Sequence, residues 1–331
     1  MCLSCGGNPP FAHLGKLSEM TSWTRPTPSP SDAARLDELA SALTAGRDAY
    51  YRIAEEHKWV PIPGSQAETD ANALHGRTPT AVANGRLAEF PLISEAVATF
   101  LELSVHHCGA LAALFQAGEV YGPPFGALRS VVEDCAYTLW MLDPELSAPD
   151  RLARAYVHNL RSAENANTAA SRLGEKALAK PRKTAFADVR ADAAEAFPGT
   201  TKEQIEGKVV AGHGYPKFLV EFTESLFKLA EDHAGGTMTQ RQANGLYTYL
   251  SNGTHPTLYV LRDMRELYEE DGATRSKLVV DVAFLEKFTL LATIGLLFTL
   301  ESVRNYFGWP TSDVDDFAKA ITLAFPDALK S

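Results

Sequence analysis

The sequence has few of the residues and motifs that mark the common small folds and enzyme families. Only four of its 331 residues are cysteine, which is too few for a disulfide scaffold. It contains no P-loop, no Gly-x-Gly-x-x-Gly after a strand, no Gly-x-Ser-x-Gly and no His-Glu-x-x-His. The familiar nucleotide hydrolases, dehydrogenases and esterases therefore find no support in the sequence.

Positive charge is also scarce, since 31 Lys and Arg stand against 41 Asp and Glu, for a net charge of −10. Binders of nucleic acids and membrane surfaces gain affinity from clustered Lys and Arg, so we expect neither DNA nor a membrane as a partner. No basic segment followed by an apolar one opens the chain, and the most apolar stretch, 288–300, is too short to span a bilayer. We expect a soluble, cytoplasmic protein.

Residues 1–31 are predicted to form a flexible tail, because their prolines and glycines cannot sustain a helix. Met20 is a second candidate start of translation. Ser31 or Asp32 then offers an N-cap for a helix that reaches about His57. Residues 59–77 have two prolines, two glycines and little periodicity, and are predicted to be a loop.

Helical signals dominate the remainder of the chain. Prolines, glycines and capping residues mark helix ends: Thr200 and Glu203 form a predicted capping box, Thr239 is a predicted cap, and Asp281 is expected to open the long apolar helix. No strand alternation or Asn-Gly hairpin lies between apolar runs. The six Lys and Arg between 172 and 190 indicate a solvated connection.

We predict an all-α fold: a single bundle of about eight to ten helices in residues 32–331, with 124–142 and 282–307 at its centre. After the first helix, the next is expected to begin at Thr80 or Asn84 and to end at about 116. The following ones are expected at 124–142, 149–173, 200–212, 216–235, 239–250, from 255 into the acidic run 266–271, at 282–307 and at 312–325.

The helix 125–142 is the most informative segment, because it is apolar nearly all round and yet carries charges. Arg129 and Glu133 are four residues apart and share one face, and Asp134 follows them. Burying such charges is costly unless they are paired. Two interpretations stay open: a structural ion pair at the centre of the bundle, or the polar wall of a pocket.

A second polar cluster lies where one helix ends at Asn252-Gly253 and another is expected to begin at His255-Pro256. Ser251, Asn252, Thr254 and His255 would then surround a helix junction. The unpaired N–H groups at the start of a helix suit a polar or anionic group. The alternative is a set of helix caps with one satisfied histidine.

Together, these two segments resemble known proteins. The run LRSVVEDCAYTLWMLDP at 128–144, followed by Tyr247-x-x-Leu-Ser-x-x-x-His255, looks like a group of uncharacterised actinobacterial helical proteins. It is also loosely similar to HEPN-type helical bundles, some of which bind nucleotides or cleave RNA. The resemblance covers about residues 95–305 and implies an all-helical fold with a nucleotide-binding or RNA-cleaving site.

HEPN nucleases use an arginine followed a few residues later by a histidine. Two pairs in this chain have similar spacing, Arg52 with His57 and Arg151 with His158. An apolar residue, Ile53 or Leu152, follows the arginine in each, where the family pattern has a polar one.

Metal ligands are sparse. Cys2 and Cys5 form half of a zinc motif, and the other two cysteines fall in apolar helices. Glu102 and His106 have carboxylate–histidine spacing, with His107 beside them, but no second helix of this kind follows. Asp150, Arg154 and His158 share a helix face, which is more typical of an exposed charge ladder. We predict no metal and no cofactor.

The sequence leaves two classes of function open. In the first, Arg129, Glu133 and His255 form a site for a small anionic ligand or nucleotide, with RNA-cleaving or other hydrolytic activity as a further expectation. Asp134, Tyr137, Ser251 and Asn252 are candidate lining residues, and Tyr137 or Ser251 is expected to complete the polar set. In the second, the protein is a non-catalytic, homodimeric scaffold whose buried charges only fix the register of its helices.

Overall fold

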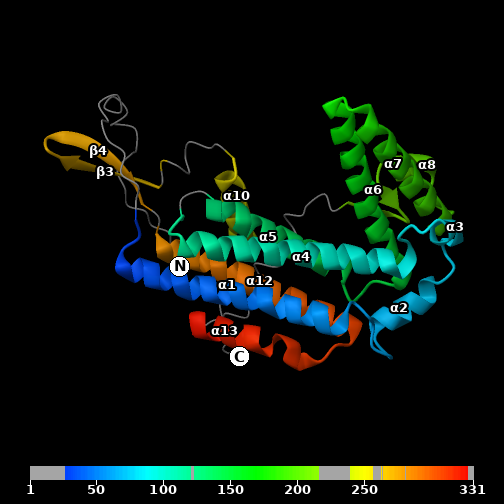
Figure 1. The fold of residues 1–331 in the computed structure, drawn as a ribbon, viewed down its shortest axis with the longest axis horizontal. Helices are drawn as coiled ribbons and strands as arrows, with labels where there is room; N and C mark the ends of the chain where they lie inside the picture. Colours follow the sequence, from blue (N-terminus) through cyan, green and yellow to red (C-terminus); the bar gives the residue numbers. More distant parts are fainter. Residues whose placement is uncertain are drawn as a thin grey trace.

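The structure is a computed structural model that describes residues 27–120, 123–215, 239–255, 262, 264–279 and 281–326. These residues form eleven α-helices, one 3-10 helix and two small antiparallel sheets, so the predicted all-α fold is confirmed (Figure 1). The two shortest helices, of five residues each, bring the number above the expected eight to ten. The elements are α1 (Pro30–His57), α2 (Gln66–Leu74), α3 (Pro79–Ala83), α4 (Glu89–Gln116), α5 (Pro123–Met141), α6 (Ala148–Leu173), α7 (Lys176–Ala196), α8 (Lys202–Glu206), β1 (Val209–Val210), β2 (His213–Gly214), α10 (Gln240–Gly253), β3 (Arg265–Glu270), β4 (Ala273–Leu278), α12 (Val282–Phe307), η2 (Thr311–Val314) and α13 (Asp315–Ala324).

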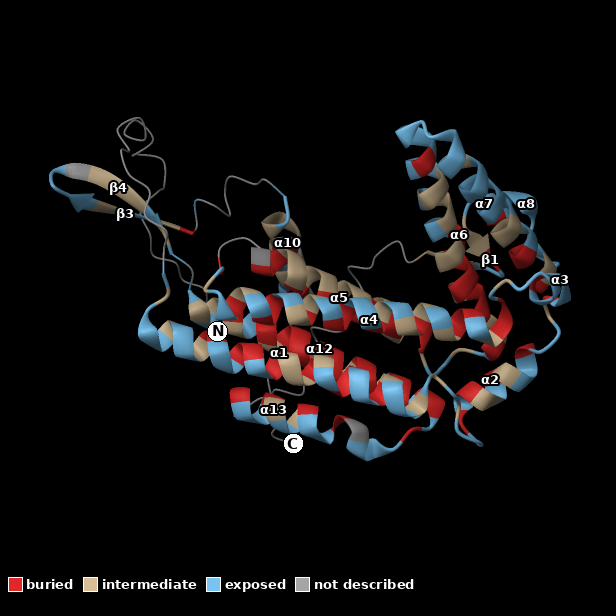
Figure 2. Ribbon diagram, viewed as in Figure 1, coloured by how far each residue is buried: buried red, intermediate tan, exposed pale blue. Residues whose placement is uncertain are grey.

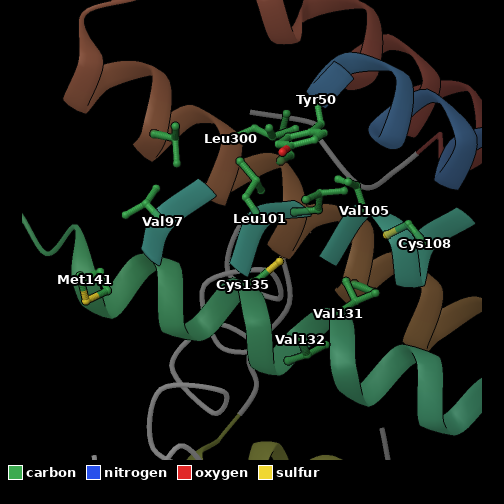
Figure 3. Close-up of a cluster of buried hydrophobic side chains, with 14 of the residues drawn as sticks. Tyr50, Val97, Leu101, Val105, Cys108, Val131, Val132, Cys135, Met141 and Leu300 are labelled. Atoms are coloured by element: carbon green, nitrogen blue, oxygen red, sulfur yellow. The ribbon is translucent and has the colours of Figure 1, made fainter. Parts of the chain in front are cut away.

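The long helices α1, α4, α5 and α12 lie side by side as a bundle, with α13 along one flank (Figure 1). Buried positions occur all around α12, and α5 packs against both α4 and α12 (Figure 2). In Figure 3, Leu101 and Val105 of α4, Val131 and Cys135 of α5, and Leu300 of α12 fill the space between these helices. Burying each aliphatic side chain of this kind contributes roughly 1.5–3 kcal/mol. The helices α5 and α12, which the sequence predicts at the centre of the bundle because of their apolar faces, do lie there.

Two bundle helices, α4 and α12, are long and apolar enough to cross a membrane when judged by length and composition alone. We expected the apolar stretch 288–300 to be too short to span a bilayer. The helix that contains it, α12, is longer at both ends than this stretch. In α12, 61% of the most apolar window is buried against other helices of the structure. Such burial is what a core helix requires.

Capping residues explain most helix ends. Thr239 caps α10 and Asp281 caps α12, as the sequence predicts, and the structure adds a reciprocal capping box between Thr239 and Gln242. The first helix begins earlier than expected: its N-cap is Ser29, rather than Ser31 or Asp32. Prolines in the first turn of a helix are tolerated, which is why Pro30 belongs to α1 and not to the tail.

Several expected boundaries are wrong. Residues 59–77 contain α2, which Ser65 caps through the Glu68 amide. The helix expected from Thr80 or Asn84 to 116 is split into α3 and α4. The connection expected at 172–190 is mostly α7, a helix with Pro181 inside it.

The segment 200–212 is likewise only partly helical. Its cap is Thr201 with Gln204, not Thr200 with Glu203, and α8 ends at Glu206. The chain then forms the small β1–β2 sheet.

The acidic run 266–271 lies in the β3–β4 hairpin and not at the end of a helix. Asp271 and Gly272 join the strands, and both have positive φ, as a two-residue type I′ turn requires. Both strands are mostly polar, and their described side chains are exposed or half-buried, so they lack the apolar alternation that identifies a strand.

Three predictions fall wholly or partly on residues outside the described ones. They are the tail over residues 1–26, the helix at 216–235, and the helix expected to begin at His255-Pro256.

Candidate functional site

The predicted pair of Arg129 and Glu133 on α5 is present. Tyr247 of α10 and Thr254, the C-cap residue of α10, make hydrogen bonds to it. Arg129 Nε donates to Glu133 Oε1 at 2.7 Å, and Arg129 Nη1 donates to Thr254 Oγ1 at 3.1 Å. The Tyr247 hydroxyl donates to the same Glu133 oxygen at 2.7 Å, and its ring lies beside the guanidinium. We call these four residues the Arg129 cluster.

A close approach of two helices builds this cluster. A Cβ atom at Gly253 would lie 2.7 Å from Cβ of Phe125, so only glycine lets the end of α10 lie against the start of α5. Tyr249 of α10 packs edge-on against the Phe125 ring, with 5.7 Å between the ring centroids. The packing of Phe125 against Gly253 and Tyr249 thus determines how α5 and α10 contact each other. This contact brings the polar side chains of the Arg129 cluster within hydrogen-bonding distance.

The cluster lies at the surface of the core rather than deep inside it. The side chains of Arg129 and Glu133 are 26% and 22% exposed. Partial burial is the largest single influence and lowers the pKa of Arg129, but the hydrogen bonds and charges of Glu133 and Tyr247 together outweigh it, so the pKa of Arg129 is raised. The hydrogen bonds to Glu133 and Thr254 occupy Nε and one N–H of Nη1, so the guanidinium keeps donors for a further partner.

Asp134, next to the pair, has an unusual environment. Burial, together with the neighbouring charge of Glu133, raises the pKa of Asp134 to about 7. Only its backbone carbonyl accepts a hydrogen bond, from Thr138, among the described residues. A carboxyl group that titrates near neutral pH can both accept and release a proton there.

Tyr137 lies on the same face of α5, two turns beyond Arg129, but it contacts another group of residues. Its hydroxyl is hydrogen-bonded to that of Tyr215, and its ring contacts Phe100 and His158. Desolvation lowers the pKa of His158 to about 3, and its buried Nε2 atom has no hydrogen-bond partner among the described residues. The Arg161 guanidinium stacks on Tyr215 at 3.7 Å from the ring centroid. We call this group the Tyr137 cluster.

Of the four residues predicted at the end of α10, Thr254 belongs to the Arg129 cluster, and the other three lie outside it in the described part of the chain. Ser251 and Asn252 are half-buried, and the Ser251 carbonyl accepts a hydrogen bond from the Thr254 hydroxyl at 2.6 Å. His255 is exposed, and no hydrogen bond among the described residues joins its side chain to Arg129 or Glu133. Thr254 therefore makes the contact that the sequence led us to expect of His255.

The two arginine–histidine spacings do not bring their side chains together. Arg52 lies near Asp316, whereas His57 stacks on Trp309. Arg151 is bound elsewhere, as described below, whereas His158 belongs to the Tyr137 cluster.

The candidate metal ligands are equally dispersed. Cys2 and Cys5 lie outside the described residues. Glu102 and His106 form an exposed ion pair at 3.7 Å, and His106 also lies 3.5 Å from the Tyr51 hydroxyl. In the described parts of the chain, no three His, Cys, Asp or Glu side chains are grouped as a metal site requires. Cys108 and Cys135 are fully enclosed in the core, where burial raises the pKa of the Cys135 thiol to about 12 (Figure 3).

Sequence reasoning missed the most deeply buried charges. Asp70 Oδ2 accepts hydrogen bonds from Arg151 Nη1 at 2.9 Å and from the Tyr306 hydroxyl at 2.8 Å. Its other oxygen accepts from the Gln66 amide, and Arg151 also donates to the Asp143 carbonyl. The Asp70 and Arg151 side chains are 1% and 2% exposed. This Asp70 cluster ties α2, α6 and α12 together.

Comparison of the chain with protein-family models, with curated proteins and with solved structures finds no match.

Proposed function

We propose that this is a cytoplasmic protein that binds a small anionic ligand, such as a phosphate ester or nucleotide, at the Arg129 cluster. The observation that carries the proposal is the state of Arg129 itself. Two hydrogen bonds hold its planar guanidinium in place, yet the side chain stays partly exposed with N–H donors to spare. A fixed guanidinium of this kind matches the two oxygens of a phosphate or carboxylate.

The neighbouring residues suit this role. Glu133 and Tyr247 fix the orientation of Arg129, so less side-chain entropy is lost when a ligand binds. His255, one residue beyond Thr254, would line the rim of the site. Asp134, with its pKa near 7, would transfer a proton if the bound ester is hydrolysed, including an RNA phosphodiester.

Thermal unfolding in the presence of ligands tests the proposal. The probes are inorganic phosphate, pyrophosphate, AMP and ATP, each added at increasing concentration. A ligand that binds only the folded protein raises the unfolding temperature by mass action. We expect at least one probe to do so, and we expect Arg129→Gln to abolish the shift.

A matched control is Arg47→Gln, which removes a half-buried arginine whose ion pair, within the described chain, is with its neighbour Asp48. This variant should keep the full shift. No shift with any probe, or equal shifts in the wild type and Arg129→Gln, would contradict the proposed site.

The scaffold alternative is supported by the Asp70 cluster, whose charges are enclosed and serve the packing of three helices. If the Arg129 cluster had the same purpose, the chain would be a homodimeric interaction protein. Light scattering after size exclusion would then give a dimer, and none of the four probes would raise the unfolding temperature.

A further inference from the structure

The far end of the α6–α7 helical hairpin differs in charge from the rest of the chain. Residues 171–185, here called the basic tip, contain five Lys or Arg and one Glu, within a protein of net charge −10. Gly174, with φ of 73°, closes the turn between the two helices. Every residue of the basic tip except Ala179 is exposed, and Figure 2 shows this end of the hairpin beyond the bundle.

The cations of the basic tip have no partners within the described chain. None of them forms an ion pair, whereas Arg190, further along α7, is bound to Glu206 at 2.5 Å. The cations concerned are Arg172, Lys176, Lys180, Arg182 and Lys183.

Helix stability does not account for the lysines of α7 either. Lys176 is the first residue of the helix, where the partial positive charge of the helix dipole disfavours a cation. Lys176 and Lys180 are four residues apart, so two like charges share one face and repel. The positive charges of Lys176 and Lys180 therefore do not stabilise α7, which favours a role for them in binding an external partner.

Apolar side chains accompany the charges. Leu173 is 69% exposed and Leu178 is 47% exposed, on either side of the turn. The basic tip contains no aromatic residue. Nucleic-acid sites usually add aromatic side chains on which bases stack, and this tip offers leucines instead.

From this combination we infer that the basic tip docks on an anionic lipid membrane. Lysine and arginine side chains are attracted to the negative headgroups of the cytoplasmic leaflet, and exposed leucines gain by entering the boundary between headgroups and acyl chains. The negative net charge of the whole chain, which led us to expect no membrane partner, conceals this local concentration of positive charge. The inference is independent of the site at Arg129.

Vesicle flotation tests it. The full-length protein is mixed with phosphatidylcholine vesicles that contain roughly one-quarter phosphatidylserine, or with pure phosphatidylcholine vesicles, at about 0.15 M salt. We expect it to float with the anionic vesicles only, and to be released as the salt concentration rises. The double variant Lys180→Glu/Lys183→Glu should bind at least roughly ten-fold more weakly.

Two control variants separate the basic tip from general surface effects. Lys287→Glu/Lys319→Glu makes the same charge change on exposed lysines of α12 and α13 and should leave binding within about two-fold of the wild type. Leu173→Ser/Leu178→Ser should weaken binding several-fold, whereas Leu323→Ser, at an 84% exposed leucine of α13, should not. Far-UV circular dichroism verifies that each variant is folded.

The inference is overturned if the protein floats with neither kind of vesicle, if it binds both equally, or if the basic-tip variants bind like the wild type. Tip-dependent binding to single-stranded RNA or to an acidic peptide, without vesicle binding, would also overturn it.

Discussion

The Asp70 cluster and the Arg129 cluster are built from the same three kinds of side chain in opposite surroundings. Each joins an arginine to a carboxylate that also accepts a tyrosine hydroxyl, and in each the guanidinium lies beside that tyrosine ring. Asp70 and Arg151 are almost completely enclosed, whereas about a quarter of the Arg129 side chain is exposed. The same chemistry therefore locks three helices together in one place and leaves a cation accessible in the other.

The largest effect is expected from breaking the enclosed cluster. Asp70→Ala leaves the Arg151 charge buried without its partner, so we expect the free energy of unfolding to fall by about 3–5 kcal/mol. Urea denaturation measures the loss. The control Asp48→Ala removes an exposed carboxylate that pairs with Arg47 and should cost about 0–1 kcal/mol. Equal losses in the two variants would refute the distinction between enclosed and exposed pairs.

The second effect concerns pH and Asp134. The pKa of its carboxyl group rises from 3.8 to about 7 on folding, so between these values the folded protein holds a proton that the unfolded chain has released. The contribution of Asp134 to stability is therefore complete below about pH 4 and is lost as the pH rises through 7. The whole change is about 2–4 kcal/mol.

Asp134→Asn, which cannot ionise, should remove that dependence. The variant should match the wild type near pH 4 and exceed it in free energy of unfolding above pH 7, as measured by urea denaturation at each pH. If the wild-type advantage instead grew with pH, the carboxyl would be stabilised as an anion and the assignment would be wrong.

The comparison of the two clusters also explains what the sequence could reveal. Arg129 and Glu133 were found because four-residue spacing on one helix guarantees a shared face. Asp70 and Arg151 are 81 positions apart and meet only after α2, α6 and α12 pack, and no local pattern encodes such a meeting. Asp70 was harder still to find, because prolines and glycines that indicate a loop flank α2.

The fold was predictable where local signals agreed with burial. The apolar faces of α5 and α12 indicated two buried helices, and the caps Thr239 and Asp281 indicated where α10 and α12 begin. The β3–β4 hairpin was missed because its strands are polar on both faces, so only the turn at Asp271-Gly272 carried a strand signal. The contact of Arg129 with Thr254 depended on the close approach at Gly253, which a sequence does not disclose.

The third prediction quantifies the accessible cluster. Arg129→Ala should lower the free energy of unfolding by about 1–2 kcal/mol, because the pair is neither enclosed nor fully exposed and Glu133 keeps its hydrogen bond from Tyr247. Urea denaturation again gives the value. A loss as large as that of Asp70→Ala would mean that Arg129 is a structural residue, which would favour the scaffold alternative.

The smallest effects are expected at the end of α10, where two adjacent residues can be compared directly. Thr254→Ala removes the oxygen that accepts the Nη1 hydrogen bond of Arg129, and should cost about 0.5–1.5 kcal/mol. His255→Ala changes an exposed side chain and should alter stability by less than about 0.5 kcal/mol.

Ligand binding separates these two residues further. Loosening Arg129 in Thr254→Ala should reduce the thermal shift given by the best of the phosphate probes, since a guanidinium that is no longer fixed loses more entropy on binding. His255→Ala should reduce that shift only slightly, because His255 lies at the rim of the proposed site and Arg129 remains fixed. If His255→Ala abolished the shift while Thr254→Ala left it intact, the anion would be held by the exposed histidine, and the Arg129 cluster would be a helix contact like the one around Asp70.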